Sequence, residues 1–228
     1  DAGIDTLIFV TGRNKRAIED HFDSNFELEA ALRMKGNDEQ ADMVHKILPN
    51  GVECIFVCQP EQLGLGHAVL CAERVVGKES FAVILADDFL ISDGDGATSD
   101  LVNAYQVSGK SQLSVTKVEG PEISKYGVVK PNNISGSVAG LIEKPSIEEA
   151  PSNLISVGRY ILTADIFDIL RDQPVGIGGE IQLADAINEQ ATQGNVESVS
   201  LDGRRFDCGH VSGYLKAIMH IASKEGLI

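Results

Sequence analysis

Residues 81–88 read Phe81-Ala82-Val83-Ile84-Leu85-Ala86-Asp87-Asp88, an apolar run that ends in two carboxylates. Such an uninterrupted apolar run is typical of a strand buried on both faces, as in the sheet of an α/β protein. In an open α/β sheet, ligands bind in the crevice beyond the carboxyl ends of the strands. The stretch therefore predicts a buried strand with a polar site at its end.

Strand and helix patterns alternate on both sides of this run. Strands are expected at 6–10 and 53–57, amphipathic helices between 14 and 48, and a further helix at 66–76. Ser24 and Glu27 have the spacing of a capping box and predict a helix start. Shorter strands are expected at 127–129, 138–143 and 154–162, with helices at 164–171, 180–189 and 212–224. This alternation predicts an α/β fold with a mixed, mostly parallel central sheet and helices on both faces.

Charge and composition exclude several classes of protein. The 228 residues carry 34 acidic and 19 basic side chains, a net charge of −15, which argues against binding to nucleic acid or to an anionic membrane. An anionic ligand must then be held by a few cations, by backbone amides or by a metal ion. No apolar run approaches the roughly 18 residues of a membrane span. No secretory signal opens the chain, and its four cysteines form no C-x-x-C pair, so we expect reduced thiols and a cytoplasmic location.

Three carboxylates are candidate metal ligands. Asp87 and Asp88 follow the apolar strand, and Asp207 ends a second strand-like run. One or two carboxylates, with water and phosphate oxygens, are the usual ligands of Mg²⁺ in proteins. An aspartate pair after a strand is equally common in an ordinary turn.

A glycine-containing loop, Gln59-Pro60-Glu61-Gln62-Leu63-Gly64-Leu65-Gly66-His67-Ala68, leads from a strand into a helix. Glycines let a flat ligand or a phosphate approach the backbone, and amides at a helix start favour anions. A plain turn and helix cap explain the spacing as well. The loop is not a G-x-G-x-x-G fingerprint, and the sequence contains no P-loop motif, so a Rossmann oxidoreductase is disfavoured.

Two further segments contain charged residues at the ends of predicted elements. Glu143-Lys144-Pro145 ends a strand, and Lys144 could hold a phosphate as a point charge, or form an ordinary solvated pair with Glu143. Gly178-Gly179-Glu180 opens the helix expected at 180–189, where Glu180 could simply be an acid stabilised by the helix dipole.

Taken together, these segments resemble a known family. The motifs, in order, are Thr11-Gly12-Arg13-Asn14-Lys15, residues 59–68, Leu85-Ala86-Asp87-Asp88, Lys125-Tyr126-Gly127-Val128, Glu143-Lys144-Pro145, Val157-Gly158-Arg159-Tyr160, Gly179-Glu180-Ile181-Gln182-Leu183 and Asp207-Cys208-Gly209. The chain resembles the bacterial UTP–glucose-1-phosphate uridylyltransferases, the UDP-glucose pyrophosphorylases of the sugar nucleotidyltransferase superfamily. The resemblance runs from about residue 3 to the end.

The resemblance implies a fold, a reaction and a set of roles. The fold is the Rossmann-like nucleotide-diphospho-sugar transferase fold, and the reaction joins UTP and glucose 1-phosphate to give UDP-glucose and pyrophosphate. By the resemblance, Asp87 and Lys144 are catalytic, Gln59 and Gly64 bind the nucleotide, and Gly127, Glu143, Val157 and Glu180 surround the sugar. Asp87 and Asp207 hold Mg²⁺, with Asp88 secondary, and the protein is a homodimer or homotetramer.

The chemistry agrees with these roles, because a sugar phosphate is already an anion and needs no general base. Catalysis then consists of in-line positioning and charge neutralisation at the α-phosphorus.

Two departures from the family pattern stand out. Ala86 replaces a usual proline, and the family's N-terminal strand with its triphosphate-binding loop is missing before Asp1. We therefore expect residues 1–228 to form one nucleotidyltransferase domain, truncated at its N-terminus and possibly at its C-terminus, and inactive as a fragment.

Two other functions stay open at this point. A glucose-1-phosphate thymidylyltransferase has the same scaffold, and a catalytically silent module could bind a nucleotide sugar without turnover. The presence of Asp87, Lys144 and Asp207 argues against the silent module.

Overall fold

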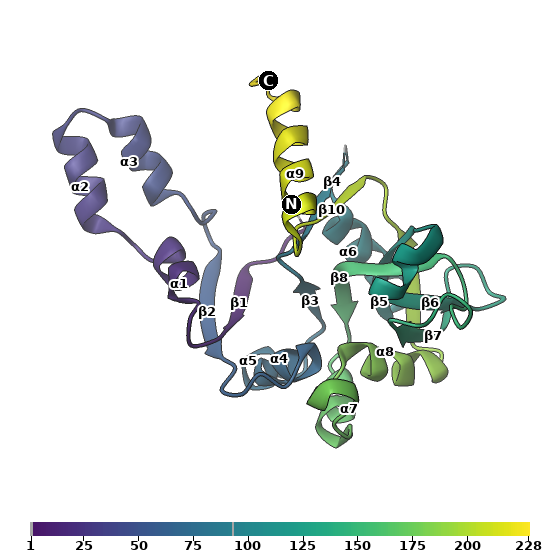
Figure 1. Ribbon diagram of the computed structural model, residues 1–228. Coiled ribbons are helices and arrows are strands. Elements are labelled where there is room, and N and C mark those ends of the chain that lie inside the picture. Colours follow the sequence, from purple (N-terminus) through teal and green to yellow (C-terminus); the bar gives the residue numbers. More distant parts are fainter. Residues whose placement is uncertain (1, 93) are drawn as a thin grey trace.

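The computed structural model describes residues 2–92 and 94–228 (Figure 1). Its strands are β1 (Thr6–Thr11), β2 (Glu53–Cys58), β3 (Phe81–Ile84), β4 (Asp88–Ile91), β5 (Ser111–Lys117), β6 (Gly127–Pro131), β7 (Val138–Glu143), β8 (Leu154–Leu162), β9 (Val196–Ser200) and β10 (Arg204–Asp207). Its α-helices are α1 (Arg16–Phe22), α2 (Phe26–Met34), α3 (Asp38–His45), α4 (Leu65–Cys71), α5 (Glu73–Val76), α6 (Ala97–Ser108), α7 (Ile166–Asp172), α8 (Leu183–Thr192) and α9 (Val211–Lys224). Two 3₁₀ turns, η1 (Gly120–Lys125) and η2 (Ile177–Gly179), complete it.

The strands form three hydrogen-bonded groups. The largest runs β7-β6-β8-β5-β9, with β3 also paired to β8, while β1 pairs with β2 and β4 with β10. Helix α6 covers one face of the large group, where Gln112 of β5 donates to the Ser108 hydroxyl at the end of α6 (2.8 Å). Helices α4, α7 and α8 cover the other face (Figure 1). The predicted α/β fold, with a mixed sheet between helices, is confirmed.

The expectation of a mostly parallel sheet is wrong. Only the β1–β2 and β5–β9 pairs are parallel among the pairings described, and the other five are antiparallel. Both parallel pairs are strands separated in sequence by helices, which supply the crossover that parallel pairing needs. Strands β6, β7 and β8 follow one another without an α-helix between them, and so they pair antiparallel.

Strand β8 contains an irregularity that positions the site. Its register against β5 shifts between the Leu113–Tyr160 and Val115–Ser156 pairs, so the intervening part of β8 does not pair with β5. That part pairs with the end of β3 instead: the Leu85 amide donates to the Gly158 carbonyl (2.9 Å). Bulges of this kind re-aim side chains and are common beside functional sites.

The main core lies between the large sheet and α4, α7 and α8. Its fully buried side chains include Leu113, Leu162, Phe167, Leu170 and Ile187, and the Phe81 and Phe167 rings stack at 5.0 Å. A second, smaller cluster consists of Ile123, Val128, Ile155 and Val157.

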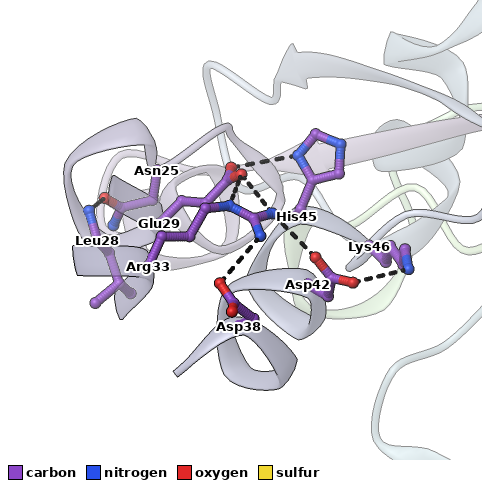
Figure 2. Close-up of polar contacts among 8 residues, drawn as sticks. All are labelled: Asn25, Leu28, Glu29, Arg33, Asp38, Asp42, His45 and Lys46. Carbon is purple, nitrogen blue, oxygen red and sulfur yellow. Dashed lines mark hydrogen bonds and ion pairs between the residues drawn. The ribbon is translucent and has the colours of Figure 1, made fainter. Parts of the chain in front are cut away.

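Helices α2 and α3 form a hairpin that projects away from the large sheet (Figure 1). Arg33 holds it together: its guanidinium lies 3.0 Å from carboxylate oxygens of both Glu29 and Asp42 (Figure 2). The predicted capping box at its start is wrong, because Asn25 is the N-cap and its side chain accepts from the Leu28 amide (3.0 Å).

Two other helix boundaries differ from expectation. The helix expected at 66–76 is divided at Ala72 into α4 and α5. The helix expected to begin at Glu180 begins at Leu183, since Glu180 has extended backbone angles (φ −111°, ψ 150°). Glu180 is therefore not a first-turn acid of α8, and its side chain is free to line a cavity instead.

Candidate functional site

A cavity of about 240 Å³ lies where β6, β7 and β8 meet the start of α8. It is lined by Leu65, Gly127, Leu141, Glu143, Lys144, Ser156, Tyr160, Glu180, Gln182, Leu183, Ala184 and Ile187. Pockets for drug-sized ligands measure roughly 300–1,000 Å³. This cavity is smaller and suits one sugar ring.

Gly127 and Glu143 face each other across the β6–β7 pair. A Cβ on Gly127 would lie 3.2 Å from Glu143 Oε2, so glycine leaves room for that carboxylate. Burial raises the pKa of Glu143, and the nearby Lys144 opposes the rise. Lys144 Nζ lies 3.6 Å from Glu143 Oε1. A carboxylate and an ammonium group thus stand together at the cavity.

Lys144 has an unusual backbone. Its φ is 45°, and it is the only non-glycine residue with positive φ in the described part of the chain. Its amide donates to the Tyr126 carbonyl (3.0 Å), which holds the segment in place. Strained backbone of this kind concentrates at functional sites. This geometry favours Lys144 as a positioned phosphate-binding cation over an ordinary solvated ion pair with Glu143.

Asp87 and Asp207 converge on one point beside Gly209. A Cβ built on Gly209 would lie 3.1 Å from Asp207 Oδ1 and 3.3 Å from Asp87 Oδ2. The Cys208 amide also donates to the Asp87 carbonyl (2.7 Å), which ties the two segments together. Two converging hard oxygen ligands fit a divalent cation that takes its other ligands from water and phosphate. Within residues 2–92 and 94–228 there is no metal-binding group of three or more His, Cys, Asp or Glu.

Asp88, in contrast, is engaged by the protein itself. It is buried, and its carboxylate accepts from the Gly158 amide (2.7 Å) and from Arg205 Nε (2.6 Å). Burial alone would lower the pKa of Arg205, but hydrogen bonds to Asp88 and Tyr126 raise it. Both oxygens of Asp88 therefore serve the scaffold, and the structure favours Asp87 over Asp88 as the cation ligand.

Tyr126 connects the carboxylates to the cavity. Its hydroxyl donates to Asp207 Oδ2 (3.1 Å), the Arg205 guanidinium lies 4.5 Å from its ring centroid, and its carbonyl accepts from Lys144. Tyr126 thus contacts both Lys144, the predicted phosphate-binding residue, and Asp207, a predicted metal ligand.

The glycine loop packs against the segment that contains Glu180. Gly64 has φ 91°, and a Cβ there would lie 2.7 Å from Glu180 Cβ. The Ile181 amide donates to the Leu63 carbonyl (2.7 Å), and its carbonyl accepts from the Gly66 amide (2.8 Å). Gln59 Nε2 donates to the Gly64 carbonyl (3.1 Å) and lies 3.1 Å from His67 Nδ1. The predicted nucleotide loop and the sugar-side segment are therefore one connected unit.

Comparison with known proteins decides the family. The nucleotidyl transferase family model matches residues 1–224. The chain is 43% identical over 234 residues to the UTP–glucose-1-phosphate uridylyltransferase of Haemophilus ducreyi, covering 98% of this chain and 79% of that protein.

Solved structures agree. A UTP-bound UDP-glucose pyrophosphorylase from Acinetobacter baumannii is similar with a TM-score of 0.88 and 40% identity, covering 98% of this chain and 79% of that one. A UDP-glucose pyrophosphorylase complexed with UDP-glucose has a TM-score of 0.85 and 39% identity, with 98% and 82% covered.

The chain belongs to the UTP–glucose-1-phosphate uridylyltransferase family. The resemblance stated from the motifs is confirmed, as is the nucleotidyltransferase fold that it implied. Nucleotidyltransferases generally use a divalent metal ion, and the Asp87–Asp207 pair is suited to hold one. Within the described residues, no helix has the length and apolarity needed to cross a membrane.

The structure of this uridylyltransferase family member places the predicted residues in two groups. Gly127, Glu143, Lys144 and Glu180 share the cavity, and Asp87 meets Asp207. The Val157 side chain lies elsewhere, fully buried in the small apolar cluster and outside the cavity lining. The roles of all these residues, Val157 included, remain predictions.

Sequence reasoning missed Ser156, Tyr160, Tyr126 and Arg205 as parts of this region. Tyr126 and Tyr160 stood inside quoted motifs, but nothing in the motifs showed which side chains face the site, and Arg205 lies in the strand-like run that ends at Asp207. Ser156 directly precedes the Val157 motif and carried no signal of its own.

Proposed function

We propose that this chain transfers a uridylyl group from UTP to glucose 1-phosphate, forming UDP-glucose and pyrophosphate. The observation that carries the proposal is the pairing of the Glu143–Lys144 cavity with the Asp87–Asp207 carboxylates through Tyr126. A sugar phosphate needs a pocket for its ring, a cation for its phosphate and a nearby place for the nucleotide phosphates. In this proposal the cavity receives the ring, Lys144 binds the phosphate, and the nucleotide phosphates lie beside Asp87 and Asp207.

The residues have separate tasks in this proposal. Glu143 and Glu180 accept hydrogen bonds from sugar hydroxyls, and Gly127 leaves room for the ring. Lys144 holds the phosphate of glucose 1-phosphate and so lowers its repulsion from the nucleotide. Gln59 and Gly64 bind the uracil base, and Val157 supports the sugar side through its strand.

We propose Mg²⁺ as the cation held by Asp87 and Asp207. When bound, it would neutralise charge on the nucleotide phosphates. Part of the negative charge between residues 51 and 100 would then serve to hold a cation, which reverses the local sign of the field. Asp88 contributes by holding its neighbour Asp87 in position.

The direct test is pyrophosphate release by the complete natural protein supplied with UTP and glucose 1-phosphate. We expect turnover with Mg²⁺, its loss on chelation, and a preference for UTP over dTTP. Turnover only with dTTP would establish the thymidylyl alternative. Binding of UDP-glucose without any turnover would establish the silent module.

The homodimer or homotetramer and the cytoplasmic location remain predictions. Light scattering at several protein concentrations measures the first. Free thiols at Cys54, Cys58, Cys71 and Cys208 are compatible with a reducing compartment, and fractionation of cells tests it.

A further inference from the structure

The side-chain amide of Gln59 makes two contacts inside the glycine loop. Its Nε2 lies 3.1 Å from the Gly64 carbonyl oxygen and 3.1 Å from His67 Nδ1. A backbone carbonyl can only accept a hydrogen bond, so the atom that faces it must be the amide nitrogen and not the amide oxygen. The Gly64 contact therefore fixes the direction in which the Gln59 amide points.

This orientation determines the state of the His67 ring. The amide nitrogen of Gln59 only donates, so Nδ1 of His67 must accept, and a ring nitrogen that accepts carries no proton. The neutral ring then has its proton on Nε2, which lies 3.9 Å from Cys71 Sγ. Burial raises the pKa of the Cys71 thiol, and the nearby Cys58 adds to the rise, so the sulfur is a neutral, weak acceptor. Both contacts of the ring agree with this tautomer.

One polar atom of the Gln59 amide stays available to a ligand. Both N–H groups of Nε2 have an acceptor in the loop, whereas Oε1 has no hydrogen-bond partner in the described part of the chain. Gln59 is half-buried, and its Oε1 is not one of the fully buried side-chain atoms that lack a partner, so this oxygen keeps contact with solvent. The amide thus offers an incoming base an acceptor and no donor.

We propose that His67 is a positioning residue that keeps Gln59 Oε1 turned toward the base and thereby selects uracil over cytosine. The inference rests on the proposed function, in which Gln59 binds the base of UTP. Uracil in a nucleotide has a single N–H, at N3, and this group can donate to Oε1. Cytosine has an accepting N3 at the same place, and two acceptors that face each other leave both unpaired. Thymine has the same N3–H as uracil, so the contact does not distinguish UTP from dTTP.

Removal of the His67 acceptor should weaken this selection. In the parent, turning the Gln59 amide to present Nε2 to cytosine breaks the contacts with both Gly64 and His67. Without the His67 acceptor, turning it breaks only the contact with Gly64. We therefore expect the preference for UTP over CTP to fall about 3- to 10-fold, which is the effect of one hydrogen bond.

Dissociation constants for UTP, CTP and dTTP, measured by calorimetry on the complete natural protein, test the proposal. His67→Leu removes the acceptor and keeps a side chain of similar size. It should lower the ratio of CTP to UTP dissociation constants about 3- to 10-fold and leave the ratio of dTTP to UTP within about twofold of the parent. His67→Asn can place its amide oxygen near the former Nδ1 and should restore the parent ratio for CTP.

His220→Leu is the matched control. His220 is also half-buried, and its Nδ1 also has a polar neighbour, Arg204 Nη1 at 3.3 Å, but it lies on α9 and outside the glycine loop. This variant should leave both nucleotide ratios unchanged. Nitrogen-15 NMR of the parent at alkaline pH, where a histidine ring is neutral, should find the His67 proton on Nε2. That measurement needs no substitution, so it tests the proposal even if a variant does not fold.

The outcomes separate the two proposals. A parent that releases no pyrophosphate from UTP and glucose 1-phosphate contradicts the proposed function, whatever the nucleotide ratios are. An active parent whose ratio of CTP to UTP is unaltered in His67→Leu overturns the role of His67 alone, and so does a proton on Nδ1. Equal losses of affinity for all three nucleotides in both His67 variants would show that His67 only supports the fold of the loop, which also overturns the proposal.

Discussion

The Asp88 carboxylate accepts a 2.7 Å hydrogen bond from the backbone amide of Gly158, 70 residues further along the chain. This bond ties the turn that contains Asp87 to the bulged part of β8, whose neighbours Ser156 and Tyr160 line the cavity. The carboxylate side and the sugar side of the site are therefore held by one shared contact. Changes at either residue should affect both sides.

Gly158→Ala should damage this contact. A Cβ at Gly158 would lie 2.6 Å from Leu85 Cβ and 2.8 Å from Asp88 Oδ2, closer than atoms can approach. Overpacking of this kind typically costs about 1–3 kcal/mol. We expect a lower free energy of unfolding in urea and a loss of turnover. Gly12→Ala is the control, since nothing lies within 4 Å of its Cβ position, and equal stability of the two variants would contradict the close approach.

Substitutions at the two adjacent aspartates should separate chemistry from stability. Asp87 is exposed, so Asp87→Ala should melt like the parent and lose nearly all metal-dependent turnover. Asp88→Ala removes the closer carboxylate partner of the Arg205 guanidinium and leaves it only Asp207 Oδ2 at 3.9 Å. Breaking a buried ion pair costs roughly 3–5 kcal/mol, which sets the upper end of the expected destabilisation. Calorimetry with Mg²⁺ and thermal melting on both variants measure this. If Asp87→Ala kept its Mg²⁺ affinity, the metal assignment would fail.

Lys144 offers a test that uses its backbone. Both Lys144→Ala and Lys144→Gly remove the ammonium group and should raise KM for glucose 1-phosphate about 10- to 100-fold, while KM for UTP changes little. Glycine adopts the φ of 45° without strain, so the glycine variant should be about 1 kcal/mol more stable than the alanine variant. Kinetics that match the parent would make Lys144 a solvated surface residue.

Glu143 should make stability depend on pH in a defined direction. Burial raises its pKa above the reference value of 4.5, so the folded state binds this proton more tightly than the unfolded state does. The resulting stabilisation is fully present below pH 4.5 and is lost as pH rises through the folded pKa. Relative to the parent, Glu143→Gln should therefore gain stability as pH rises from 4 to 8 in a series of urea titrations. A constant difference across this range would show that the shift is absent.

The α2–α3 hairpin should depend on Arg33. A hydrogen bond from Arg33 lowers the pKa of Glu29 from its reference value of 4.5; burial opposes this, and the nearby His45 adds to the lowering. The contribution of Glu29 is therefore present above pH 4.5 and lost as pH falls through the lowered pKa. Arg33→Leu at neutral pH should reduce amide protection factors within residues 26–45 and leave those of β5 and β8 unchanged. Unaltered protection in the hairpin would mean that Arg33 is dispensable there.

Most local elements, and the residue types at the site, could be predicted from the sequence. The apolar run before Asp87 predicted a strand, but its predicted burial on both faces is wrong, since Ile84 is 48% exposed. The alternating patterns predicted an α/β fold, and strands 138–143 and 154–162 have the predicted bounds. The ordered motifs were enough to indicate the family. These properties depend on neighbouring residues and on short spacings, which a sequence states directly.

Which side chains lie together could be seen only once the chain was folded. Asp87 and Asp88 are equivalent in the sequence, yet β4 begins at Asp88, pairs with β10 and buries that carboxylate against Arg205, while Asp87 stays exposed beside Asp207. Antiparallel pairing of β6, β7 and β8, and the bulge that brings Ser156 to the cavity, also depend on contacts between distant segments. The direction in which a side chain points from a sheet depends on the strand that pairs with its own. The sequence around a residue does not specify which strand that is.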